Sequence, residues 1–139
     1  MKQRADVFLR EEQITKTVNI TNFDKPEIDQ DILDKWQRII DLVAMIMDVP
    51  SGLIMQITED SMSVFLKSKN KENPYEEGGS DKLGHGLYCE TVIGTDAELL
   101  IENALENESW KDNPDVKLDM SSYYGLPIIW PDNDFFGTI

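Results

Sequence analysis

The strongest constraint on the fold is a single apolar stripe between residues 32 and 47. Apolar side chains recur there at three- and four-residue steps, whereas Asp34, Arg38 and Asp41 fall on the opposite side. This spacing predicts an amphipathic helix that must pack against a flat apolar surface. The apolar members of the stripe are Ile32, Trp36, Ile39, Ile40, Val43, Ile46 and Met47.

Polar residues and prolines mark both ends of this helix. Asp24 can cap the free amides of a first turn, Pro26 is tolerated in that turn, and Glu27 stands three residues after Asp24, as in a capping box. At the other end, Pro50 stops the helical pattern. We therefore expect the helix to begin near Asp24, and residues 1–23, which show no sustained period, to form an arm or a fraying helix.

Two strand pairs account for much of the remaining chain. Residues 53–58 and 62–68 are rich in apolar and β-branched side chains and flank a tight polar connection, which predicts a hairpin. A second hairpin is expected at the end of the sequence, with strands at 122–130 and 135–139 around a polar turn. The chain thus predicts a mostly antiparallel sheet.

A long polar segment lies between the two predicted hairpins. Residues 69–86 carry several glycine and proline turn signals and predict a loop, and long loops in compact domains often act as functional lids. A short helix is expected at 87–93, closed by Gly94 in a left-handed cap, and a short strand at 98–102. Together these elements predict an α+β fold with the long helix against one face of the sheet.

Composition and charge exclude several functions. The 139 residues fit one domain, and 27 acidic against 13 basic residues give a net charge of −14. Such a surface repels phosphate backbones and anionic lipids, so we expect no nucleic acid and no direct membrane contact. One cysteine and one histidine cannot build a zinc site with four ligands, and we predict no metal. The sequence opens without a secretory signal, so a cytoplasmic location is expected.

Short motifs follow one another in a specific order along residues 30–139. They are Trp36-Gln37, Asn73-Pro74-Tyr75, Gly86 to Ile93, Asn103-Ala104, Trp110 to Asp115, Tyr123 to Ile128 and Phe136 to Ile139. Taken together, these motifs resemble a GAF domain, of the subgroup found at the front of bacterial sensor histidine kinases and GGDEF diguanylate cyclases. The resemblance implies a GAF/PAS-like central antiparallel sheet, with helices on one face and a loop-covered pocket on the other.

The same resemblance implies a function. It predicts a non-catalytic sensory or regulatory domain that binds a small ligand and relays the signal to an output domain in bacterial signal transduction, such as a two-component system. The GAF-like domain would span residues 24–139, after an N-terminal arm or linker at 1–23. Because related domains continue past Gly137-Thr138 into a C-terminal helix, we expect this domain to be truncated there. A homodimer through terminal helices stays open, and the resemblance names neither the ligand nor a cofactor.

Five residues are the candidates for lining the ligand pocket: Phe65, Tyr88, Cys89, Trp110 and Tyr123. Trp110 stands in the polar segment 107–119, where its ring either anchors the loop to the core or forms an aromatic wall of the pocket. Tyr88 and Tyr123 each offer a ring for contact and a hydroxyl for orienting a ligand. Phe65 either lines the pocket or packs under the long helix.

Cys89 is the single candidate for covalent chemistry. A reactive thiol needs a base or a positive field nearby, but the next residue is Glu90, and His85 lies four positions earlier. Some GAF relatives reduce methionine sulfoxide with several cysteines and others attach bilins, whereas this chain has one cysteine. Asn70-Lys71 matches only the start of the cyclic-nucleotide GAF signature. We therefore predict no catalytic residue.

Two further functions are alternatives to the sensory one. The first is a degenerate GAF domain that acts as a dimerisation or protein-interaction scaffold, in which the apolar helix stripe and the Trp110 loop pack against another chain. The second, less favoured, is a thiol-dependent reductase that uses Cys89.

Overall fold

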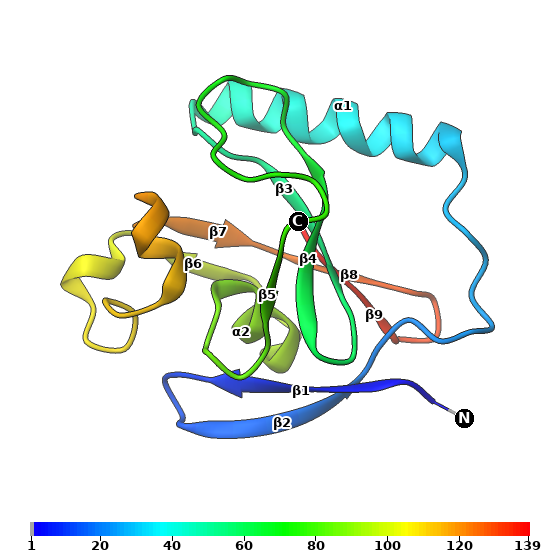
Figure 1. Cartoon of the computed structure of the whole chain (residues 1–139), viewed down its shortest axis with the longest axis horizontal. Coiled ribbons are helices and arrows are strands. Elements are labelled where there is room, and N and C mark those ends of the chain that lie inside the picture. Colours follow the sequence, from blue (N-terminus) through cyan, green and yellow to red (C-terminus); the bar gives the residue numbers. More distant parts are fainter. Residues whose placement is uncertain (1) are drawn as a thin grey trace.

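A five-stranded antiparallel sheet forms the centre of the computed structural model, which describes residues 2–139 (Figure 1). Its strand order is β5-β4-β3-β9-β8, with β3 at Leu53–Ile57, β4 at Ser61–Lys67, β5 at Ser80–Lys82, β8 at Pro127–Ile129 and β9 at Phe135–Thr138. Two small antiparallel sheets accompany it: β1 (Arg4–Leu9) with β2 (Ile14–Asn19), and β6 (Leu99–Ile101) with β7 (Tyr123–Gly125). The predicted α+β class, the central antiparallel sheet and the β3–β4 hairpin are confirmed.

Helix α1 (Gln30–Met47) covers one face of the central sheet, as predicted. The stripe expected to make this contact does so only through Trp36 and Ile40, because its other members, Ile32, Ile39, Val43, Ile46 and Met47, are exposed. Ile40 and Phe136 form the buried contact, and Trp36 meets Phe136 edge to face with 5.4 Å between ring centroids. The helix begins later than expected, because Asp29 rather than Asp24 caps it by accepting a hydrogen bond from the Ile32 amide. The earlier segment serves another contact, in which Lys25 binds Asp132 and Asp134 in the β8–β9 turn.

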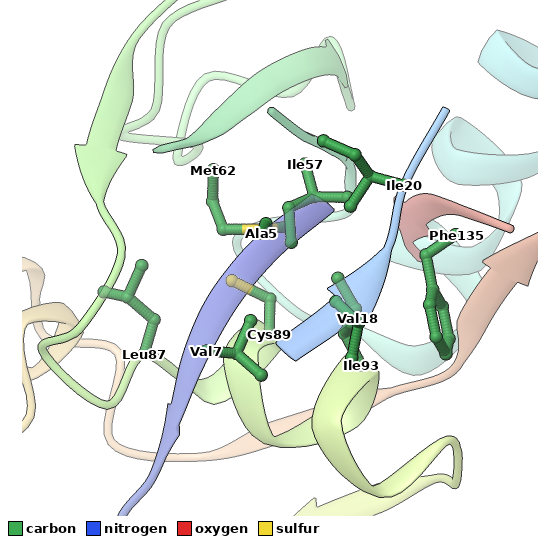
Figure 2. Close-up of a cluster of buried hydrophobic side chains, with 10 residues drawn as sticks. All are labelled: Ala5, Val7, Val18, Ile20, Ile57, Met62, Leu87, Cys89, Ile93 and Phe135. Carbon is green, nitrogen blue, oxygen red and sulfur yellow. The ribbon is translucent and has the colours of Figure 1, made fainter. Parts of the chain in front are cut away.

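The opposite face of the sheet is covered by α2 (Tyr88–Thr95) and by the β1–β2 hairpin. Figure 2 shows the shared core, in which Val7 from β1, Cys89 from α2 and Met62 from β4 lie together. Helices therefore lie on both faces, which corrects the expectation that they share one. Seven of the eight α2 residues are buried, because the sheet covers one side of this helix and the hairpin covers the other.

Residues 1–23 were predicted as an arm or a fraying helix, and this prediction is wrong for the described part. Residues 4–19 form the β1–β2 hairpin, and its inward side chains Ala5, Val7 and Leu9 are buried at every second position. Such a period of two is typical of a strand, but here it covers only a few residues of the sequence. Phe8, an apolar residue at a half-buried position, obscured the alternation.

Two other boundaries differ from prediction. Helix α2 ends at Thr95, and the left-handed capping residue is Asp96 (φ 49°), not Gly94. Gly94 has a packing role instead, since a side chain there would collide with Leu9 and Val7 of the hairpin. The predicted strand at 122–130 is divided into β7 and β8, which pair with different partners, β6 and β9. Across residues 2–139, no helix is both long enough and apolar enough to cross a membrane.

Glu90 is a buried carboxylate that joins three segments of the chain. Its Oε2 accepts hydrogen bonds from the amides of Phe8 in β1 (2.7 Å) and Gly84 (3.0 Å). Its Oε1 accepts one from the amide of Leu87 (3.0 Å), the residue that precedes α2. A buried charge is tolerated only when such donors surround it. Glu90 therefore fixes the hairpin against the loop and the start of α2.

We expect Glu90→Gln to lower the free energy of unfolding by about 1–3 kcal/mol, because the amide turns an NH₂ group toward at least one backbone donor that then lacks an acceptor. Urea unfolding followed by circular dichroism measures the loss. Glu106→Gln, at an exposed position in the short helix at Ala104–Glu106, is the matched control and should stay near the parent value. Equal stability of the two variants would contradict the role given to Glu90.

Candidate functional site

The five predicted pocket residues lie in three different places. Phe65 packs under α1, with its ring 6.2 Å from that of Trp36, which decides between the two roles considered for it. Cys89 points into the core between the hairpin and the sheet (Figure 2). Tyr88, Trp110 and Tyr123 come together in one cluster on the α2 side of the sheet. The structure thus brings together three of the five.

These three aromatic rings form a continuous stack. The Tyr88 ring lies between the other two, 4.7 Å from Tyr123 with an interplanar angle of 13° and 5.2 Å from Trp110 with an angle of 25°. Tyr88 opens α2, Tyr123 opens β7, and Trp110 follows the short helix at Ala104–Glu106. Trp110 is fully buried, so its ring anchors the loop and also forms the wall of the cluster. The rings occupy the space between α2 and the loops.

Hydrogen bonds fix the positions of two of the three rings. The Tyr88 hydroxyl donates to the Met120 carbonyl oxygen (2.8 Å), and the Trp110 indole Nε1 donates to Glu11 Oε1 (3.0 Å). Because Met120 and Glu11 are 109 residues apart in the sequence, no local pattern reveals this arrangement. The stack is therefore specified by tertiary contacts on both of its edges.

The tip of the β1–β2 hairpin closes over the same cluster. Arg10 donates from Nε to the Gly86 carbonyl (2.7 Å) and from Nη2 to the His85 carbonyl (2.9 Å). Its guanidinium carbon also lies 5.9 Å from the centroid of the Trp110 ring, within the range of a cation–π contact. Arg10 and Glu11 were missed because their segment was expected to lie outside the domain.

A second polar contact joins the long loop to the Trp110 segment. The Tyr75 hydroxyl donates to Asp115 Oδ1 (2.9 Å). Asp115 lies in the short helix Pro114–Leu118, which Asn113 caps by accepting from the Asp115 amide, so the turn predicted at this place is confirmed. Burial raises the pKa of the Asp115 carboxyl, the Tyr75 hydrogen bond opposes that rise, and the charge of Asp81 adds to it.

The arrangement offers ring faces and the carboxylates of Glu11 and Asp115, but no activated nucleophile. Burial raises the pKa of the Cys89 thiol well above its usual range, and the charges of Asp115 and Glu90 act in the same direction. A protonated thiol is a poor nucleophile. Within residues 2–139, no three histidine, cysteine or acidic side chains are grouped so that they could hold a metal ion.

Neither a protein-family model nor a curated protein sequence matches this chain. Its function is therefore inferred from the arrangement of its own residues, together with the resemblance of its motifs to GAF domains.

We expect the Cys89 thiol to react with Ellman's reagent at about pH 8 on the order of 100-fold more slowly in the folded protein than in urea. Burial and the raised pKa both keep the thiol protonated and out of reach. The absorbance of the released thiolate measures both rates. Similar rates in the two states would show that Cys89 is accessible and would revive covalent chemistry.

Asp115 gives a pH-dependent prediction. Because its pKa is raised on folding from a usual value of about 4, the folded state holds this proton more tightly, and the associated stability is lost as the pH rises through that window. Asp115→Asn keeps an oxygen for Tyr75 and removes the titration. The stability of the variant relative to the parent should therefore increase between about pH 4 and pH 7 in urea unfolding. Parallel stability curves would contradict a raised pKa.

Proposed function

We propose that this chain is a non-catalytic regulatory domain of the GAF type, which binds a small ligand on the α2 side of its sheet. The signal would be relayed to an output domain in bacterial signal transduction, in the cytoplasm. Two kinds of evidence support this proposal. The motifs over residues 30–139 resemble GAF domains, and the rings of Tyr88, Trp110 and Tyr123 lie together in one cluster.

One observation carries this proposal: three motifs that are far apart in the sequence meet in one aromatic stack. Tyr88, Trp110 and Tyr123 each belong to one of the motifs that resemble GAF domains. Ring faces with a few polar groups at their edges are typical of small-molecule sites. Tyr75 and Asp115 supply such polar groups beside the stack.

The packing of the stack suggests how ligand binding would be linked to a change of conformation. Because the rings already fill the space, a ligand can enter only if the segment that carries Trp110 moves away from Tyr88. That movement breaks the contacts of Trp110 with Glu11 and Arg10. A ligand that prefers the open arrangement shifts the population toward it, and this difference in affinity is the signal.

The second candidate function, an interaction scaffold, is favoured by a different observation. The side of α1 that faces away from the sheet carries large apolar side chains, among them Ile39, Met45 and Ile46, that are exposed in the monomer. Contiguous exposed apolar patches commonly mark protein interfaces. By contrast, the buried Cys89 gives no support to a thiol-dependent reductase.

We expect a small ligand to raise the melting temperature and to change the fluorescence of Trp110. In a Trp36→Phe, Trp130→Phe variant, Trp110 is the reporter; in a matched Trp110→Phe, Trp130→Phe variant, Trp36 on the other face is the reporter. A suitable panel is cyclic AMP, cyclic GMP, methionine sulfoxide and biliverdin. A ligand at 100 times its Kd stabilises by about 2.7 kcal/mol, which is readily seen. A panel without any thermal shift, or equal changes in both reporters, would count against a site at the stack.

A further inference from the structure

The C-terminal half of α1 carries an apolar surface that no other described part of the chain covers. Its large side chains are Ile39, Leu42, Val43, Met45, Ile46 and Met47, which are 38–77% exposed. Scattered apolar residues are normal on a surface, but adjacent ones on a single helix form a patch. The two basic residues of α1, Lys35 and Arg38, precede this patch. The helix therefore contains no basic residue from Ile39 to Met47.

A groove adjoins this patch at the end of the helix. It has a volume of about 630 Å³ and lies between the last turns of α1 and the start of the loop after β4. Ala44, Met45, Val49 and Pro50 supply apolar lining; Asp41, Asp48 and Glu72 supply acid, against the single base Lys69. Met45 belongs to both the groove and the exposed patch, so the two form one continuous surface.

The end of the helix adds to the negative potential of the groove. The last turn of α1 contains no basic residue, and the capping residue is itself an acid, Asp48. Helix C-termini carry partial negative charge, which is stabilised by nearby cations. Here nothing in the last turn supplies one, so a partner with lysine or arginine beside apolar side chains is complementary to this surface.

We propose that this surface, the outer face of α1 with the groove at its C-terminal end, binds a basic amphipathic helix of a partner protein. The proposal rests on the second candidate function, the interaction scaffold, and names its partner. A second copy of the chain fits less well, because a two-fold contact would place the same patch against itself. Each copy also has a net charge of −14, so two copies repel each other.

The test uses the whole chain and a fluorescein-labelled synthetic helix of the same length as α1, 18 residues, with leucine on one face and lysine on the other. Fluorescence anisotropy should give saturable binding that weakens as salt screens the charges. A peptide with glutamate in place of lysine should not bind. A peptide of the same composition without the apolar stripe should bind more weakly, because it cannot cover the patch.

Paired variants separate this surface from the general acidity of the protein. Asp48→Asn with Glu72→Lys, a charge change of +3, should weaken binding at least about fivefold, whereas Glu106→Lys, a change of +2 outside the groove, should have a much smaller effect. Met45→Ser with Ile46→Ser should weaken binding about tenfold or more, against little change for the equally exposed Leu100→Ser with Leu105→Ser. Asn is chosen at position 48 because the backbone there is left-handed (φ 53°).

Each outcome decides the proposal. Selective loss in the α1 variants supports it, whereas no binding, or equal loss in the control variants, overturns it. Light scattering measures the oligomeric state. If the parent is a dimer and the Met45→Ser, Ile46→Ser variant is a monomer, the basic-helix partner is overturned and the scaffold function is retained. If the protein is a monomer and does not bind the lysine peptide, both the basic-helix partner and the scaffold function are contradicted. None of these results bears on the ligand titration at the aromatic stack.

Discussion

The buried carboxylate of Glu90 is the contact on which the α2 side of the molecule depends. Taking a charge out of water costs several kcal/mol, and the amides of Phe8, Gly84 and Leu87 offset that cost only when all three reach it. The first strand of the chain, the loop before α2 and the first turn of α2 must therefore assemble together. This requirement makes the N-terminal hairpin part of the core and not an appendage.

The position of the hairpin tip follows from that contact. Once Phe8 is fixed to Glu90, the next residues Arg10 and Glu11 reach the loops beside α2, where they bind the His85 and Gly86 carbonyls and the Trp110 indole. The two faces of the sheet meet in β9, where Phe135 packs into the hairpin core and its neighbour Phe136 packs under α1. Two adjacent residues of one strand thus connect the hairpin core with the core under α1.

The sequence predicts those elements whose information is local, and it does not predict those that depend on contacts between distant residues. The apolar stripe predicts α1 because its period is sustained over many residues. The β3–β4 hairpin is predicted because its strands are apolar and flank a polar turn. Asp24 and Asp29 are equally good caps by residue type, and only the contacts of Lys25 with Asp132 and Asp134 decide between them. Of the candidate site, three aromatic positions were found from motifs. Tyr75 and Asp115 also stand in such motifs, but the long-range contact between them has no local signal, and neither has the contact of Arg10 with Trp110.

The two faces of the sheet differ in how their surfaces are built, and this difference supports a division of function. On the α2 side, separate hydrogen bonds surround the aromatic stack: Arg10 donates to the Gly86 carbonyl, Glu11 accepts from the Trp110 indole, and Asp115 accepts from the Tyr75 hydroxyl. On the other side, α1 packs on Phe136 with its inner face and leaves an apolar outer face exposed. The proposed division of function uses this difference: a ligand would act on the side where separate polar contacts surround the rings, and a partner would cover the exposed apolar face of α1.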